Sequence, residues 1–187
     1  MNQGLTEGRY FFIDVARDGI ALYQSDASDL SEPKPKTPDQ ALAMAREYFD
    51  EWLPSAKAFE EGAAFYVSKG RLKEAAFSFH QATERYLHSV LLVCTFHSPR
   101  IHNLGFLRTQ AERIDPRLIE VWPREVKADR ARFEKLKEAY VKARYSKLYR
   151  ITETELLWLR ERVEVLGQIV EVICSEHIAR LERSAAA

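Results

Sequence analysis

Two long segments of this chain repeat apolar residues at steps of three and four, and this spacing constrains the fold most. It occurs between residues 72 and 93 and again between 156 and 177. Because a helical turn takes about 3.6 residues, the spacing lines up one apolar face along each helix. A seam sustained over three heptads predicts helices packed in a bundle. The two faces consist of Leu72, Ala76, Phe79, Thr83, Tyr86, Val90 and Val93, and of Leu156, Leu159, Val163, Leu166, Val170, Ile173 and His177.

Start and stop signals divide the chain after residue 38 into helices with short connections. Thr37 and Gln40 form a capping box around a proline at the first helical position, and Thr152 with Glu155 forms a second one. Pro54 is expected to kink or split the first long helix. We therefore predict an all-α, antiparallel up-and-down bundle of four to five main helices. Their expected ranges are 39–68, 72–97, 124–145 and from the Thr152 capping box to about 180, with shorter turns after His102-Asn103 and Asp115-Pro116.

The first 38 residues follow a different pattern. Residues 9–24 are rich in aromatic and β-branched side chains on both sides of Asp18-Gly19, which predicts a short N-terminal β-hairpin. A lone hairpin is only marginally stable, so it must pack on something else. Residues 25–38 are polar with three prolines and are expected to be a linker. The predicted organisation is a hairpin over 1–24, the linker, and a helical domain over 39–187.

Composition excludes some classes of protein. Lysine plus arginine and aspartate plus glutamate both number 28, so any site for an anionic partner must be local. The cysteines, Cys94 and Cys174, lie on apolar helix stripes, which favours reduced side chains and a cytoplasmic location. The longest apolar runs are too short to span a bilayer, and the start lacks the pattern of a signal peptide. We expect a soluble protein of one domain plus an appendage, without membrane contact.

Polar residues interrupt the apolar surface of the 72–97 helix. His80, Gln81 and Glu84 are too costly to bury without partners, and Arg144 is the expected partner. His80, Glu84 and His88 step by four along one face, as metal ligands do. No further ligand has suggestive spacing, so we expect no metal and no cofactor, and interpret the group as a polar strip between packed helices.

Residues 140–150 concentrate cations and tyrosines at a helix end and in the following loop. Cations supply phosphate affinity and aromatic faces stack bases, so the mixture suits a nucleotide or single-stranded RNA. The alternative is a solvated helix end whose cations complement the helix dipole. Arg144 favours binding because it lies at the edge of the apolar stripe. The residues are Tyr140, Lys142, Arg144, Tyr145, Lys147, Tyr149 and Arg150.

Several segments together resemble the HEPN family (higher eukaryote and prokaryote nucleotide-binding). Within it they resemble the subgroup fused to or paired with a minimal nucleotidyltransferase. Residues 5–14 and 18–23 look like closing strands of a preceding transferase domain, so the resemblance implies that the hairpin is its remnant. The resemblance covers about residues 40–180. The matching segments are Phe79 to Glu84, Leu91 to Val93, Pro99 to Leu104, Trp122 to Arg124, Ala139 to Tyr145, and Ile151-Thr152.

The chain departs from the family's catalytic patterns in two ways. The Gly-Ser and Asp-x-Asp motif of the transferases is missing, so nucleotidyl transfer is not expected from this chain alone. Ribonuclease-active HEPN domains place a histidine four to six residues after an arginine, whereas here Tyr149 stands at that place after Arg144. Tyrosine, with a pKa of about 10, is a poor base near neutral pH.

The resemblance therefore implies a HEPN domain that forms a homodimer, binds a nucleotide or RNA, and works with a nucleotidyltransferase partner. The setting would be a toxin–antitoxin or antibiotic-modifying system, and we expect no autonomous enzyme. Related systems nucleotidylate a loop tyrosine, here Tyr149 or Tyr145. One alternative is an active ribonuclease that uses a displaced His80 or His102. Another is a purely structural dimerisation arm. The candidate binding residues are Arg144, Tyr149, Tyr145, Lys147, Tyr140, His80 and Glu84.

Overall fold

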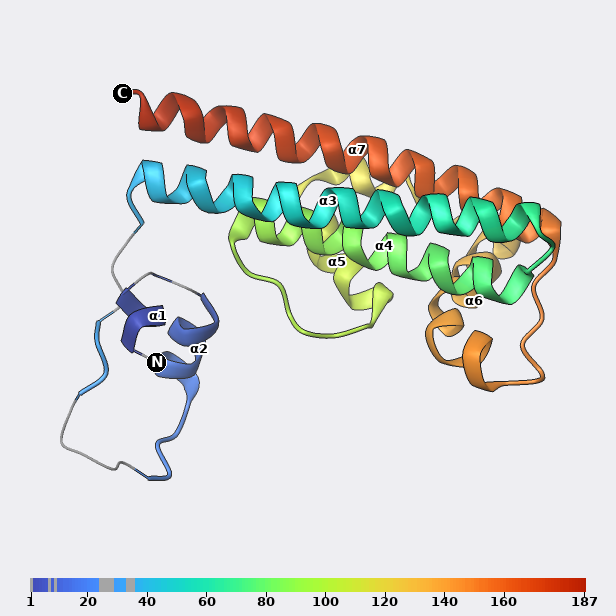
Figure 1. Cartoon of the computed structure of the whole chain (residues 1–187), viewed down its shortest axis with the longest axis horizontal. Helices are drawn as coiled ribbons and strands as arrows, with labels where there is room; N and C mark the ends of the chain where they lie inside the picture. Colours follow the sequence, from blue (N-terminus) through green and yellow to red (C-terminus); the bar gives the residue numbers. More distant parts are fainter. Residues whose placement is uncertain (1, 7, 9, 24–28, 33–35) are drawn as a thin grey trace.

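The computed structural model describes residues 2–6, 8, 10–23, 29–32 and 36–187. Over these residues every regular element is a helix, which confirms the all-α class. Two long helices, α3 and α7, run side by side along the molecule, and α3 begins at the end where α7 finishes (Figure 1). The elements are α1 (Asn2–Thr6), α2 (Tyr10–Asp18), α3 (Pro38–Ser68), α4 (Leu72–Thr95), α5 (Leu104–Ile114), the 3₁₀ helix η1 (Pro116–Ile119), α6 (Lys127–Tyr145) and α7 (Glu153–Ala185).

Local sequence signals explain the ends of the long helices. The Thr37 hydroxyl accepts a hydrogen bond from the Gln40 backbone N–H at 3.2 Å, and the Gln40 side chain accepts one from the Thr37 N–H at 3.1 Å. Thr152 and Glu155 repeat this arrangement before α7. Both predicted capping boxes are thus confirmed.

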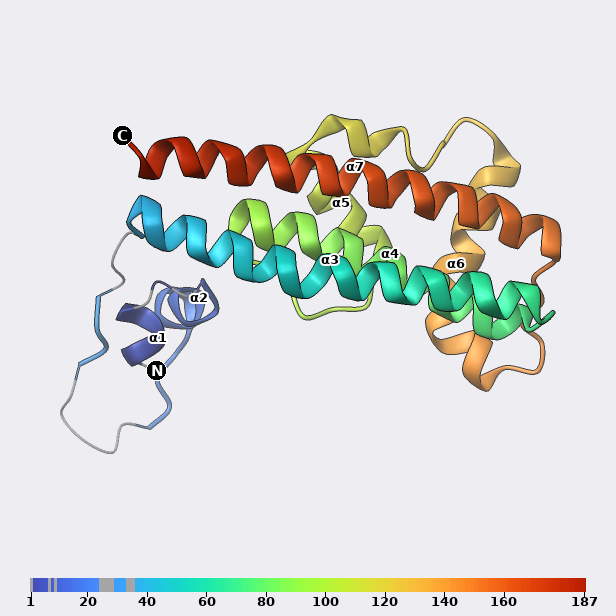
Figure 2. The ribbon, with the colours of Figure 1, turned by 45° about the horizontal axis from the view of Figure 1, so that its top comes forward.

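Pro54 does not split α3, which continues through it. The proline lies on the solvent side of the helix, where water can bind the carbonyl that loses its N–H partner. Burial against α4 and α7 on the other side holds the helix together. The two views in Figures 1 and 2 show α3 and α7 remaining adjacent along their lengths.

α4 is the central helix, since it packs against α3, α5, α6 and α7. Its predicted seam is buried except for the half-buried Leu72 at the helix start, and the predicted seam of α7 is buried except for the half-buried His177. Tyr86 of α4 packs directly on Gly167 of α7, where an added Cβ would lie 2.8 Å from the tyrosine hydroxyl. The seams therefore form one continuous core.

The predicted β-hairpin is wrong over the described residues. The first half of that segment forms α2, and the Gly19 N–H closes its end by donating to the carbonyl oxygen of Val15 at 2.9 Å. A short apolar run fits either periodicity, and a helix satisfies its backbone groups without the second strand that a hairpin needs. The residues expected in that second strand are largely exposed: Ile20 by 86%, Leu22 by 94% and Tyr23 by 86%.

The predicted linker overlaps positions whose structure is not described. Residues 24–28 and 33–35 lie outside the described residues, as do 1, 7 and 9. The linker's last residue, Pro38, is the first residue of α3. In the described ranges, none of the helices has both the length and the apolar character needed to cross a bilayer.

Candidate functional site

An aromatic stack centred on Tyr140 brings several predicted residues together. Tyr140 lies near the end of α6 and is half-buried. Its ring centroid is 4.4 Å from that of His102, 5.2 Å from that of His80 and 6.4 Å from that of Phe77, all with stacked ring planes. The guanidinium carbon of Arg144, one turn further along α6, lies 4.5 Å from the same centroid. Two helices, α4 and α6, and the segment just before α5 therefore meet at this ring.

The buried carboxylate of Glu84 holds two imidazoles. His102 Nδ1 lies 3.1 Å from both carboxylate oxygens, and His80 Nε2 lies 3.3 Å from one of them. Burial alone would raise the pKa of Glu84, but the hydrogen bonds from His80 and His102 outweigh it and hold this pKa below its usual value. The other nitrogen of His80 lies 3.0 Å from the carbonyl oxygen of Leu136. Both ring nitrogens of His80 thus face oxygen acceptors, one on α4 and one on α6.

His102 is positioned like an oriented general base. Its Nδ1 donates to the Glu84 carboxylate, so Nε2 is the ring nitrogen left for contact with a ligand. The His102 side chain is 57% exposed, whereas that of Glu84 is 9% exposed. This hydrogen bond joins the segment before α5 to α4. An imidazole held this way can exchange protons with a ligand.

Arg144 does not pair with Glu84 as the sequence suggested, because His102 takes that place. The guanidinium instead lies over three rings, with its carbon 4.5 Å from the Tyr140 centroid and 5.0 Å from those of Phe77 and Tyr145. Arg144 Nε donates to the Tyr140 carbonyl oxygen at 2.6 Å. Within the described ranges no carboxylate binds this guanidinium, and the residue is exposed. Its remaining N–H groups can bind an anion.

Arg144 also lines a groove of about 590 Å³ between α3, α4 and the end of α6. Lys73 adds a second cation, with its Nζ donating to the Ser146 carbonyl oxygen at 2.9 Å. The groove also contains the Glu74 carboxylate, which pairs with Arg71 at 2.9 Å, so Lys73 and Arg144 leave it positive beside aromatic walls, as nucleotide sites are. Its lining comprises Ala58, Phe59, Gly62, Tyr66, Lys73, Glu74, Phe77, Ser78, Ala143 and Arg144.

Two of the predicted binding residues lie elsewhere. Tyr149 is buried, and its hydroxyl donates to the Lys135 carbonyl oxygen at 3.0 Å. Burial raises the pKa of this phenol above its ordinary value. Tyr149 lines a separate hollow, and the exposed Lys147 does not line the Arg144 groove. Tyr145, which is 75% exposed, remains beside Arg144.

The sequence interpretation missed the groove residues Phe77, Lys73, Tyr66 and Phe59. A signal was present for α4, because Lys73 and Phe77 step by four on the side opposite its apolar seam. The α3 residues carried no comparable signal, since their role depends on how α3 crosses α4. Long-range packing thus completed the site.

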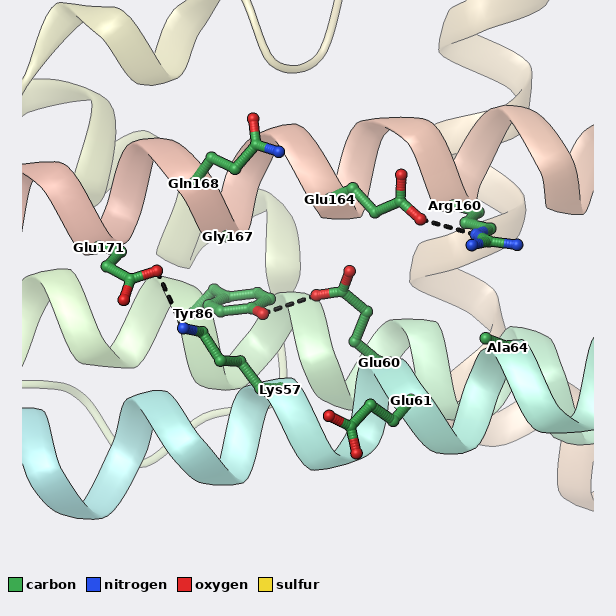
Figure 3. A pocket seen from close by; sticks show the side chains of 10 residues that line it. All are labelled: Lys57, Glu60, Glu61, Ala64, Tyr86, Arg160, Glu164, Gly167, Gln168 and Glu171. Atoms are coloured by element: carbon green, nitrogen blue, oxygen red, sulfur yellow. Dashed lines mark hydrogen bonds and ion pairs between the residues drawn. The ribbon is translucent and has the colours of Figure 1, made fainter.

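A second groove, of about 410 Å³, lies between α3 and α7 and is shown in Figure 3. Its cations are paired with its own acids: Lys57 with Glu171 at 2.9 Å and Arg160 with Glu164 at 2.6 Å. The Tyr86 hydroxyl donates to Glu60 at 2.6 Å, and burial raises the pKa values of both groups. Because these charges bind one another, the groove presents a weaker site for a charged ligand than the Arg144 groove.

The metal interpretation of His80, Glu84 and His88 gains no support. Among the residues that the structure describes, no group of three or more His, Cys, Asp or Glu side chains is arranged so that it could hold a metal ion. His88 instead pairs its Nδ1 with the Ser98 hydroxyl.

The fold and the site define an all-α bundle domain with a local cation and aromatic groove. The family model of the HEPN domain matches residues 49–176, which is more than half of the chain. The chain therefore belongs to the HEPN domain family. The matched range contains Glu84, His102, Tyr140 and Arg144. No curated protein sequence matches the chain.

Proposed function

We propose that this HEPN domain binds a nucleotide or RNA in the Arg144 groove and serves as a binding domain rather than as an autonomous enzyme. The observation that carries the proposal is the environment of Arg144. Its guanidinium is held in place by the rings of Phe77, Tyr140 and Tyr145 while no carboxylate in the described ranges neutralises it. A fixed guanidinium with free N–H groups binds phosphate oxygens in a two-pronged geometry.

The composition of the groove supports the same class of ligand. Lys73 supplies a second positive charge, and Phe59, Tyr66 and Phe77 supply aromatic surface. Bases stack on such surfaces, and each stacking contact contributes about 1–3 kcal/mol. A phosphate could thus bind the cations, and a base could stack on the aromatic rings of the same groove, although the chain as a whole has no net charge.

The residue at position 149 argues against catalysis by the motif that ribonuclease-active members of the family use. Tyr149 stands where ribonuclease-active members place a histidine, and its hydroxyl is buried against the Lys135 carbonyl. A phenol with a raised pKa does not accept a proton near neutral pH.

The proposal includes a homodimer and a nucleotidyltransferase partner, both of which the family resemblance implies. Exposed apolar side chains near the end of α6 support a protein contact there. Val141, Tyr145 and Leu148 are 54%, 75% and 87% exposed at the end of α6. Burying them against another chain would remove apolar surface from water close to the ligand.

A tyrosine acceptor for nucleotidylation is also part of the proposal. The family resemblance offers Tyr149 or Tyr145, and exposure favours Tyr145. The Tyr149 hydroxyl is already bonded and buried, whereas Tyr145 is open to solvent beside a cation that attracts phosphate. Peptide mass spectrometry after incubation with a partner transferase and a nucleoside triphosphate should locate the adduct on Tyr145. An adduct on Tyr149 would instead require the loop to open.

A ribonuclease is the second candidate, and the Glu84–His102 pair is the observation that favours it. His102 has the orientation of a base that could take a proton from a ribose 2′-hydroxyl, with Arg144 across the Tyr140 ring to bind the phosphate. This function predicts RNA cleavage to 2′,3′-cyclic phosphate ends that His102→Ala abolishes. RNA that stays intact, while a known HEPN ribonuclease cuts it in the same assay, excludes this function.

Equilibrium binding tests the leading proposal. Wild-type protein, Arg144→Gln and the control Arg150→Gln are titrated with adenosine 5′-monophosphate and with a short labelled RNA. Arg150 is a suitable control because it lies only six residues after Arg144 but lines the separate hollow beside Tyr149. We expect Arg144→Gln to weaken binding at least tenfold and Arg150→Gln to leave it nearly unchanged. Equal affinities for wild type and Arg144→Gln would reject the proposed site.

A further inference from the structure

A second cation lies on the same strip of α4 as the groove wall. Phe77, Gln81 and Arg85 follow one another at steps of four, so their side chains lie on one line along the helix. All three are half-buried, unlike the fully buried seam on the other side of α4. This line continues the Arg144 groove along α4.

Arg85 has the same kind of environment as Arg144. Its guanidinium carbon lies 5.2 Å from the ring centroid of Trp52 and 5.3 Å from that of Phe59. No hydrogen bond or ion pair joins this guanidinium to a carboxylate anywhere in the described ranges. Phe59 also lines the Arg144 groove, so the two cations border one continuous surface.

On α4, Gln81 lies between Arg85 and Phe77, the ring over which Arg144 of α6 is placed. Its side-chain nitrogen is buried and has no hydrogen-bond partner among the residues described by the structure. Buried polar groups are normally bonded, so this unpaired donor would gain a hydrogen bond if the half-buried Gln81 side chain rotated toward a ligand. An oxygen of a phosphate, a ribose or a base edge would satisfy it.

We propose that Gln81 and Arg85 form a second anion subsite and that the ligand of the whole groove is a single-stranded oligonucleotide. The inference rests on the proposed function of the Arg144 groove. One phosphate lies at Arg144 and Lys73, and another lies at Arg85. The two guanidinium groups and the rings of Trp52 and Phe59 offer stacking surface to the bases between the phosphates.

The spacing along α4 distinguishes an oligonucleotide from a mononucleotide. Arg144 stacks over Phe77, and eight residues separate Phe77 from Arg85, which corresponds to about 12 Å along a helix. Adjacent phosphates of one nucleoside polyphosphate are much closer than this. Phosphates on either side of a splayed nucleotide can reach both positions, and the aromatic side chains occupy the interval where its base would lie.

Affinity as a function of ligand length tests the inference. Wild-type protein is titrated with adenosine 5′-monophosphate, with a dinucleotide and with a 2′-O-methylated tetranucleotide, which cannot be cleaved at its 2′ positions. We expect the tetranucleotide to bind at least tenfold more tightly than the mononucleotide. Arg85→Gln should weaken tetranucleotide binding about tenfold and leave mononucleotide binding unchanged, while Arg144→Gln should weaken both.

Three further variants separate the subsite from general effects. Arg160→Gln removes one charge from the second groove, between α3 and α7, and should change neither the mononucleotide affinity nor the tetranucleotide affinity. Arg85→Lys keeps the charge and the fold and should retain part of the affinity, while Gln81→Leu should weaken only the tetranucleotide. The slope of log affinity against log salt should fall by about 0.7 in Arg85→Gln, as expected when one phosphate contact to a single strand is lost. Circular dichroism of each variant confirms that it is folded.

The outcomes separate this inference from the proposed function. Equal affinities for the mononucleotide and the tetranucleotide, or an Arg85→Gln protein that is folded and binds the tetranucleotide like wild type, overturn the second subsite alone. Absence of binding by all three ligands overturns the proposed function, and the second subsite with it.

Discussion

Replacing Gly167 with alanine tests the contact that joins α4 to α7. A Cβ at this position would lie 2.8 Å from both Cζ and the hydroxyl oxygen of Tyr86, and 3.3 Å from its Cε1. Side-chain carbons do not approach so closely, so the ring would have to move. Tyr86 is 1% exposed and its hydroxyl donates to Glu60 at 2.6 Å, so movement also disturbs this hydrogen bond (Figure 3).

The size of the effect follows from three contributions. Overpacking a tight core costs about 1–3 kcal/mol. Loss of a hydrogen bond to a carboxylate adds about 1.5–3 kcal/mol. Alanine in place of a mid-helix glycine stabilises the folded state by about 1 kcal/mol, which offsets part of this loss. We therefore expect Gly167→Ala to lower the free energy of unfolding by about 1.5–5 kcal/mol.

Gly62→Ala is a matched control, because Gly62 is also in the interior of a long helix, α3. No heavy atom lies within 4 Å of a Cβ built at Gly62. Only the helix preference of alanine remains, so this variant should be stabilised by up to about 1 kcal/mol. The same chemical change thus has opposite expected signs at the two positions.

Urea denaturation followed by far-ultraviolet circular dichroism measures the free energy of unfolding for both variants and the wild type. The m-value should stay constant, so that the midpoint reports stability. If Gly167→Ala proves as stable as Gly62→Ala, Tyr86 does not pack on Gly167 as described, and the argument about the central core is refuted.

Other changes have smaller and distinct expected effects. Glu84→Gln should lower the free energy of unfolding by about 1.5–3 kcal/mol near pH 7, because the carboxylate that binds His80 and His102 is lost. The folded-state pKa of Glu84 is lowered, so its stabilising contribution is complete above the usual value of 4.5 and is lost as pH falls through the folded value. Urea titrations across that range should show a steeper acid loss in wild type than in Glu84→Gln, and parallel curves would contradict this. Thr152→Ala removes a capping box and should lower stability by about 1 kcal/mol in thermal melts, with an unchanged melt disproving the role of the cap. Tyr149→Phe should lower the free energy of unfolding by about 0.5–1.5 kcal/mol and leave RNA affinity unchanged. Weakened RNA binding would instead show that Tyr149 contributes to the binding site.

The helical bundle could be predicted from the sequence where burial dictates periodicity. The α4 and α7 seams repeat over several turns, and a period of 3.6 residues is the only one that fits them. The boundaries followed from side chains that bond nearby backbone, such as Thr37 and Thr152. These signals are local, so one sequence is enough to show them. The segment at α2 was misassigned because its apolar run is too short to distinguish the two periods.

The candidate site was only partly visible in the sequence. Tyr140, Arg144, His80 and Glu84 were identified as costly or unusual residues, and the structure brings them to one place. The sequence could not show that His102 would take the position expected for Arg144. It also could not show that Tyr149, only five residues after Arg144, would turn into the core. Both outcomes depend on how distant segments pack.

The most direct test of the central claim is a crystal structure of this chain with a bound nucleoside monophosphate. The account predicts phosphate oxygens within about 3 Å of the Arg144 guanidinium, and the base against aromatic side chains of the same groove. A nucleotide bound only in the groove beside Gly167, or anywhere away from Arg144, would contradict it.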